Sequence, residues 1–167
     1  METIYSAEEI ATRISELGRQ MRADAGDETI TLIAILKGTT VFLADLLREI
    51  DAPVNYELMN VVRSVADTKT AEALQINFIT NFFLEGRNII LLKDVVSTGV
   101  IETYLMTQLR QKSGVKIRLA ALLDREEMRT VPLEVDYAAF SVPPGSYVGY
   151  GLELDSQYSN FREIRRL

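Results

Sequence analysis

Residues 88–103 read Asn-Ile-Ile-Leu-Leu-Lys-Asp-Val-Val-Ser-Thr-Gly-Val-Ile-Glu-Thr, and this stretch decides the fold. Ile89 to Leu92 form a short, continuous apolar run, which is typical of a strand buried on both faces of a parallel sheet. Lys93 and Asp94 follow where such a strand emerges at its carboxyl end. From Val100 to Arg110, apolar residues recur at every fourth position, which predicts a helix. The stretch therefore predicts the strand, turn and helix of an α/β fold.

The turn of this unit has the chemistry of an anion site. Backbone N–H groups converge at the start of the helix, and the hydroxyl groups of Ser97 and Thr98 can donate hydrogen bonds. Gly99 lets the backbone approach a ligand closely, and ligands of open α/β sheets bind at this edge. A plain strand-to-helix turn capped by Ser or Thr explains the same residues. A single Ser-Thr-Gly does not decide between these two interpretations.

Composition limits the chemistry that is available. The chain has 167 residues, enough for one domain with a full core. It contains no cysteine and no histidine, which excludes disulfides, thiolate or imidazole metal ligands and a Ser-His triad. Acid and base groups must be carboxylates, Lys or Tyr, and any metal must be a hard cation on oxygen ligands.

Charge and hydropathy indicate the expected location of the protein and the classes of partner that it lacks. The net charge of −6 argues against general nucleic-acid binding, which needs a basic face. The first residues have neither a basic segment nor an apolar one, so no signal peptide is expected. No apolar run approaches the length of a membrane span. We therefore expect a cytoplasmic protein without nucleic-acid or membrane partners.

The rest of the chain alternates helices and strands. Ser6 and Glu9 form a capping box that begins the first helix. Periodicity predicts further strands at 29–36, 54–62, 74–80, 117–123 and 135–142, with a polar loop at 63–72. The order predicts one domain, 1–167, with a doubly wound, mainly parallel sheet. The 54–80 hairpin and the C-terminal tail are expected to form a small flap over the carboxyl edge.

A second strand, glycine loop and helix begin near residue 29. The strand runs into Lys37-Gly38, and Lys37 could reach an anion there. A solvated loop lysine is the more common role for any one lysine, so this position stays open.

Four motifs in order resemble the hypoxanthine-guanine phosphoribosyltransferase family. They are Leu36-Lys37-Gly38, the 93–101 loop, Leu122 to Arg125 and Tyr147 to Gly151. The resemblance runs from about Ile30 to Arg162. It implies a type I phosphoribosyltransferase core with a hood, and Mg²⁺-dependent transfer of ribose 5-phosphate from phosphoribosyl pyrophosphate to a 6-oxopurine. It also implies a homodimer or homotetramer.

The resemblance assigns roles to residues on both sides of the expected site. Leu36, Lys37 and Gly38 match the pyrophosphate loop. Arg125 stands where the family has a lysine that recognises the purine, and it keeps N–H donors for a 6-oxo group. Tyr147 falls on the aromatic residue that stacks on the base. Val148 falls on the residue that offers backbone atoms to the base.

Metal and pyrophosphate ligands are altered. Glu153 falls on the Mg²⁺-binding aspartate, and Asp94 is the second candidate ligand. A tail arginine that reaches pyrophosphate falls on Ser159, with Arg162 nearby as a substitute. Ser64-Val65 lacks the tyrosine of the family's mobile loop.

The central loop departs most from the family. The ribose and phosphate positions fall on Lys93, Asp94, Ser97, Thr98, Gly99, Val100 and Ile101. Of the acid pair that accepts hydrogen bonds from the ribose diol, only Asp94 remains, since Lys93 can only donate. Ser97 replaces the aspartate proposed as proton acceptor, and loss of a positioned base typically costs about 10²–10⁴-fold. Ile101 replaces a phosphate-binding threonine.

Two interpretations follow, and a third is weaker. The first is a phosphoribosyltransferase of purine salvage with weak or altered activity, in which Asp94 and Ser97 hold the catalytic positions. The second is a homologue without catalysis that binds a purine nucleoside monophosphate as a sensor or partner subunit. An α/β domain without a purine ligand is the third, and the Tyr147 to Gly151 match argues against it.

Overall fold

The computed structural model describes residues 1–65, 72–78, 84–113 and 117–167, with side chains described outside 62–83 and 113–116. Its main sheet has the strand order β4-β3-β2-β5-β6-β7. Strands β3, β2, β5, β6 and β7 run parallel to one another, and β4 pairs with β3 in the antiparallel sense. The strands are β2 (Ile30–Ile35), β3 (Val54–Val65), β4 (Glu72–Phe78), β5 (Asn88–Val96), β6 (Ile117–Asp124) and β7 (Tyr137–Ser141). This confirms the predicted mainly parallel sheet.

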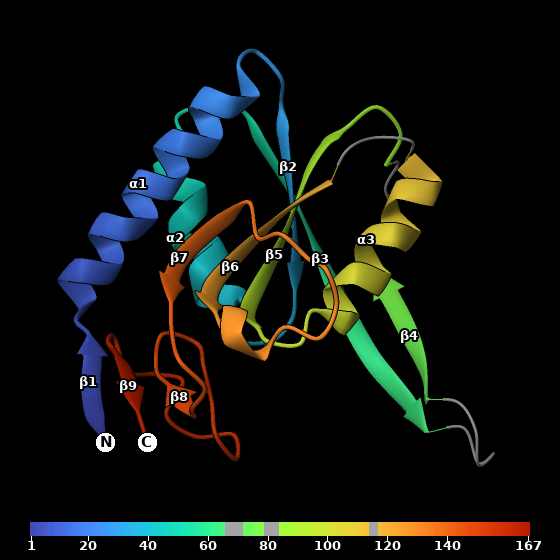
Figure 1. Ribbon diagram of the computed structural model, residues 1–167. Helices are drawn as coiled ribbons and strands as arrows, with labels where there is room; N and C mark the ends of the chain where they lie inside the picture. The colour runs from blue at the N-terminus through green and yellow to red at the C-terminus, as the bar shows by residue number, and fades with distance from the viewer. Residues whose placement is uncertain (66–71, 79–83, 114–116) are drawn as a thin grey trace.

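Helices cover both faces of this sheet, as Figure 1 shows. Helices α1 (Ala7–Ala25) and α2 (Thr40–Glu49) share a core with the even-numbered residues of β2, such as Leu32. Helix α3 (Val100–Ser113) shares the opposite core with the odd-numbered ones, such as Ile33. Successive residues of a strand point to opposite faces, so β2, which is buried throughout and apolar except at Thr31, supplies both cores. The doubly wound arrangement is therefore confirmed.

The capping box that begins α1 is confirmed. The Ser6 N–H donates to Glu9 Oε2 at 2.8 Å, and the Glu9 N–H donates to Ser6 Oγ at 3.2 Å. In α2, Phe42 is fully buried, while Val41 and Leu47 are only partly buried.

The hood is built differently from our expectation. It is a small antiparallel sheet of β1 (Glu2–Tyr5), β9 (Ile164–Arg166) and β8 (Tyr147–Val148). Figure 1 shows the two chain ends side by side in it. The β3–β4 hairpin instead extends the main sheet, so the prediction of a flap made from hairpin and tail together was wrong. Residues 2–5 carry no apolar period, which is why β1 was not predicted.

Two predicted boundaries change. The polar loop expected at 63–72 is shorter, because β3 continues to Val65 and pairs with β4 from Glu72 onward. Backbone hydrogen bonds of a hairpin need no apolar side chains, so polarity did not reveal these strand ends. Residues 66–71 and 79–80, also covered by predictions, lie outside the described residues. Strand β5 runs on to Val96, so Lys93 and Asp94 belong to the strand and not to the turn.

Strands β2 and β5 lie side by side at the centre of the sheet. From β2 the chain crosses through α2 to β3, and from β5 it crosses through α3 to β6 on the other side. The connections diverge here, and such a switch point opens a crevice at the carboxyl ends of the strands. Among the described residues, no helix is long and apolar enough to cross a bilayer.

The contact between α1 and α2 depends on Gly18. A Cβ added to Gly18 would lie 2.7 Å from the Glu49 backbone oxygen, and backbone cannot move aside cheaply. We predict that Gly18→Ala lowers the free energy of unfolding by about 1–3 kcal/mol despite the better helix propensity of alanine. Urea unfolding measures this change. The exposed Gln20→Ala on the same helix serves as control and should stay within about 0.5 kcal/mol. An unchanged Gly18→Ala would contradict the packing described.

Candidate active site

A cleft of about 380 Å³ lies at the carboxyl ends of β2 and β5, under the hood. Six residues that the sequence singled out line it, namely Lys37, Gly38, Asp94, Arg125, Tyr147 and Glu153. Val95, Gly145, Ser146, Leu152 and Leu154 complete the lining. Leu36, Lys93, Val148 and residues 97–101 are not among the lining residues. The topology therefore brings at least one residue of each of the four motifs into one crevice and places residues 97–101 of the turn after β5 beside it.

Asp94 lies at the centre of this cleft. Its Oδ1 atom accepts a hydrogen bond from the Val95 N–H at 2.8 Å and is also ion-paired with Lys93 Nζ. Its Oδ2 atom lies against Gly38, where any Cβ would overlap it. Gly38 is thus required by close approach of the Asp94 carboxylate, which ties the β2 loop to the end of β5.

The hood closes on the same loop. A Cβ added to Gly151 would lie 2.6 Å from the Gly38 oxygen, and Gly151 has a φ of 91° that favours glycine. Glu153 then reaches Lys37, with Oε2 and Nζ 2.8 Å apart. The predicted substitute Arg162 does not line this cleft. It lines a different hollow, of about 330 Å³, beside α1 and α2.

Arg125 connects the central loop with the predicted base site. Its Nη1 donates to Ser97 Oγ at 3.4 Å, and its Cζ lies 5.2 Å from the centroid of the Tyr147 ring. The Tyr147 hydroxyl donates to the Pro143 oxygen at 2.7 Å, which fixes the ring. Val148 is fully buried, so only its backbone could serve a base. A planar ligand could take the place of the Arg125 guanidinium over the Tyr147 ring. The displaced guanidinium would then present its N–H donors to the edge of that ligand.

The turn after β5 is held by neighbouring side chains. Arg129 Nη1 donates to the Ser97 oxygen at 2.8 Å, and the Thr130 N–H donates to the Thr98 oxygen at 3.0 Å. Gly99 has a φ of 81° and is packed so tightly that a Cβ would lie 2.9 Å from Leu133 Cδ2. The only bond that caps the helix from this turn, from the Val100 N–H to Thr98 Oγ1, is long at 3.5 Å, as far as the described residues show. The turn thus presents the start of α3 in a fixed conformation, which suits an anion.

Glu102 is a buried acid that the sequence analysis missed. Glu102 lies in the first turn of α3 and is only 4% exposed. Burial raises the pKa of its carboxyl above the ordinary value, and the nearby charges of Lys93 and Arg129 oppose that rise. Glu102 lies four residues before Met106 and seven before Leu109, both of which are buried, so helical spacing was the signal that could have found it.

Arg129 is a second functional candidate that the sequence did not reveal. It forms an ion pair with Asp124 in which both side chains are nearly buried, at 12% and 11% exposure. Together with its bond to Ser97, this pair links the end of β6 to the turn after β5.

The charged groups of the cleft do not fit a divalent cation. The resemblance implies Mg²⁺ at Glu153 and Asp94, yet each carboxylate already has a lysine partner, Lys37 and Lys93 respectively. Among the described residues, no three acidic side chains gather closely enough to hold a metal ion. A metal at Asp94 would have to displace the ammonium group of Lys93 from a partly buried ion pair, and like charges oppose this.

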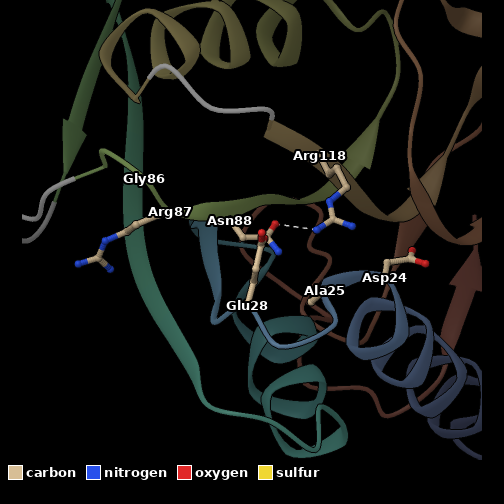
Figure 2. A pocket seen from close by; sticks show the side chains of 7 residues that line it. All are labelled: Asp24, Ala25, Glu28, Gly86, Arg87, Asn88 and Arg118. Atoms are coloured by element: carbon tan, nitrogen blue, oxygen red, sulfur yellow. Dashed lines mark hydrogen bonds between the residues drawn. The ribbon is translucent and has the colours of Figure 1, made fainter.

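A hollow of about 450 Å³ lies at the opposite, amino-terminal edge of the sheet (Figure 2). Arg118 Nη2 donates to Asn88 Oδ1 at 2.6 Å, which is the dashed line in the figure. Arg118 Nη1 donates to the Tyr137 hydroxyl, and that hydroxyl donates to Asp24 at the end of α1. Burial and the Asp24 bond raise the pKa of Tyr137 to about 12. The network joins β5, β6, β7 and α1, which gives these polar groups a structural role.

Comparison with known proteins places this geometry in context. The model of the phosphoribosyl transferase domain family matches residues 1–155. The hypoxanthine-guanine phosphoribosyltransferase of Streptococcus thermophilus (strain CNRZ 1066) is 31% identical over 157 residues, which cover 94% of this chain and 87% of the relative. The Dictyostelium discoideum enzyme of the same description is 33% identical over 167 residues, covering 98% and 91%.

Solved structures agree with this result. A hypoxanthine-guanine phosphoribosyltransferase from Bacillus anthracis superposes with a TM-score of 0.88 at 27% identity, covering 98% of this chain and 95% of that one. A Trypanosoma cruzi hypoxanthine phosphoribosyl transferase superposes with a TM-score of 0.91 at 28% identity, covering 100% and 91%. The fold is therefore shared over essentially the whole chain.

The buried Glu102 gives a test of the site's electrostatics. Its pKa is raised in the folded state, so the folded protein holds this proton more tightly than the unfolded chain does. The contribution of Glu102 to the free energy of unfolding is therefore fully present below pH 4.5. It is lost as the pH rises through the pKa that Glu102 has in the folded protein. We predict that Glu102→Gln is the more stable protein at pH 7 and that this advantage disappears below pH 4.5, in urea unfolding between pH 4 and 8.

Glu9 provides a control of opposite sign. Its pKa is lowered by hydrogen bonds from the Ser6 backbone and side chain, so its contribution is present above pH 4.5 and lost as the pH falls through its folded pKa. Glu9→Gln should be the less stable protein at pH 7. A Glu102→Gln variant that behaved like Glu9→Gln would contradict the account of Glu102.

Proposed function

This chain belongs to the phosphoribosyltransferase domain family. We propose that it binds a 6-oxopurine nucleoside monophosphate in the cleft under the hood and that it catalyses the formation of this nucleotide only slowly. The substrates would be hypoxanthine or guanine and phosphoribosyl pyrophosphate, in purine salvage. The relatives carry the name of this activity. Beside the cleft, Lys93, Ser97 and Ile101 depart from the pattern that the resemblance implies.

The observation that carries the proposal is the hydroxyl group at the position of the proton acceptor. Ser97 Oγ lies 3.4 Å from Arg125 Nη1, so the group next to the purine site is a hydroxyl beside a cation. A serine hydroxyl does not accept a proton near neutral pH, and a neighbouring positive charge makes it a weaker base still. Loss of the base accounts for about 10²–10⁴-fold in rate and leaves ligand binding in place.

The groups that bind the nucleotide remain. The start of α3 with Thr98 and Gly99 offers N–H groups to the 5′-phosphate. Arg125 lies over Tyr147, so a base stacks on that ring once the guanidinium moves to the base's edge. There its planar set of N–H groups donates to the 6-oxo group. Tyr147, fixed by Pro143, supplies a preformed surface for the base.

A second candidate function is binding without turnover, as a sensor or as a partner subunit. It is favoured by the ion pair between Lys93 and Asp94, because that pair occupies the carboxylate that would accept hydrogen bonds from the ribose diol. We also propose a homodimer or homotetramer for either function, from the family resemblance alone.

Calorimetric titration with inosine monophosphate, together with a turnover assay on hypoxanthine and guanine, tests the proposal. We expect binding with turnover that is slow or absent. Efficient turnover would show that Ser97 is compensated and would overturn the proposal. Absence of binding by both the monophosphate and phosphoribosyl pyrophosphate would show that the cleft has a different ligand.

Restoring the family's residues gives a sharper prediction. Lys93→Glu, Ser97→Asp and Ile101→Thr together return the acid pair, the base and the hydroxyl donor. An acid at position 93 would add a third carboxylate beside Asp94 and the buried Glu102, which like charge opposes. We predict that these three changes need Glu102→Gln as a fourth, and that the quadruple variant gains roughly 10²-fold in kcat/KM over wild type.

The triple variant is the matched control for that experiment. It should be less stable than the quadruple variant and gain less activity, because Glu102 remains. Equal activity and stability of the two variants would show that Glu102 does not interfere with an acid at position 93.

A further inference from the structure

We propose that Lys93 and Lys37 take the place of the divalent cation in this cleft, so that the diphosphate of phosphoribosyl pyrophosphate binds without a metal. The inference rests on the proposed function, because it concerns the ligand of the same site. It departs from what the family resemblance implies, since both candidate metal ligands of this chain are already neutralised by lysines.

Lys93 is a built part of the site and not a solvated surface lysine. Its side chain is 20% exposed and forms an ion pair with Asp94, whose side chain is 21% exposed. The Val95 N–H holds one oxygen of Asp94, and the other oxygen lies close to Gly38. The lysine charge is therefore fixed at the end of β5, beside the cleft that Asp94 lines.

Glu102 explains why that charge is a lysine. Glu102 is only 4% exposed, so its carboxylate needs a cation nearby, and among the described residues the charges of Lys93 and Arg129 act on it. Arg129 is already paired with Asp124, which leaves Lys93 to balance Asp94 and Glu102. A divalent ion at Asp94 would displace Lys93 from its ion pair and repel it. Lys93 and Glu102 thus form one charge arrangement that disfavours a metal.

Lys37 supplies the second, movable charge. Its side chain is 67% exposed and that of Glu153 is 30% exposed, so their ion pair is a surface pair of small net strength. The lysine can exchange Glu153 for a phosphate oxygen at little cost. In that exchange Lys37 gains a more highly charged partner. Both lysines act as point charges on the ligand, without the coordination geometry of a metal.

Calorimetric titration of the full chain with phosphoribosyl pyrophosphate, first in excess EDTA and then in saturating Mg²⁺, tests this inference. We expect the two Kd values to agree within about threefold. Lys93→Gln should weaken binding in EDTA by about tenfold or more, and Lys37→Gln should weaken it by a smaller factor. Lys93→Arg keeps the charge and should stay closer to wild type than Lys93→Gln.

Lys112→Gln is the matched control, because it removes the same charge at an exposed position near the far end of α3. It should bind like wild type. Lys37 is mostly exposed, so Lys37→Gln keeps the test valid even where Lys93→Gln destabilises the fold. Binding that requires Mg²⁺ in the wild type, or that is unchanged in both Lys→Gln variants, would overturn the inference.

Titration with inosine monophosphate separates the two proposals. If the monophosphate binds and phosphoribosyl pyrophosphate binds only with Mg²⁺, the lysine inference fails and the proposed function stands. If neither ligand binds under any condition, both fail.

Discussion

The contact between the Asp94 carboxylate and Gly38 determines how the cleft is assembled. It joins the loop after β2 to the end of β5, the two strands at which the chain turns in opposite directions. The hood then packs against the same loop through Gly151, which brings Glu153 to Lys37. Three segments that are far apart in sequence therefore meet around one carboxylate. A side chain at position 38 or 151 would separate them.

Charged groups surround this carboxylate. A lysine stands beside Asp94, and a buried acid stands behind it at the start of α3. Lys93 is not easily changed alone, because its loss would leave Asp94 partly buried without its counter-charge.

The parallel core could be predicted from sequence because buried stretches such as 32–35 and 89–92 are apolar without interruption. The capping box of α1 was equally clear. The terminal strand β1 could not be predicted, since four residues without a period gain their structure only from pairing with β9. The hairpin ends at Val65 and Glu72 were hidden for the same reason.

For the site, motif order identified six lining residues, but not their ion pairs. The two residues of the Lys37–Glu153 pair are 116 positions apart in sequence, and Arg125 and Ser97 are 28 positions apart. Only the tertiary structure reveals these contacts. Glu102 was missed because the predicted helix face was centred on Ile101, Leu105 and Leu109. The structure turns Met106 inward as well, and Glu102 with it.

A crystal structure grown with inosine monophosphate, pyrophosphate and Mn²⁺, with anomalous scattering recorded for the metal, tests the central claim most directly. The account predicts the purine beside Arg125 and Tyr147, the 5′-phosphate at the start of α3, and Lys37 and Lys93 within hydrogen-bond distance of pyrophosphate. It predicts no anomalous peak at Asp94 or Glu153. A manganese peak on those two carboxylates, with both lysines turned away, would contradict it.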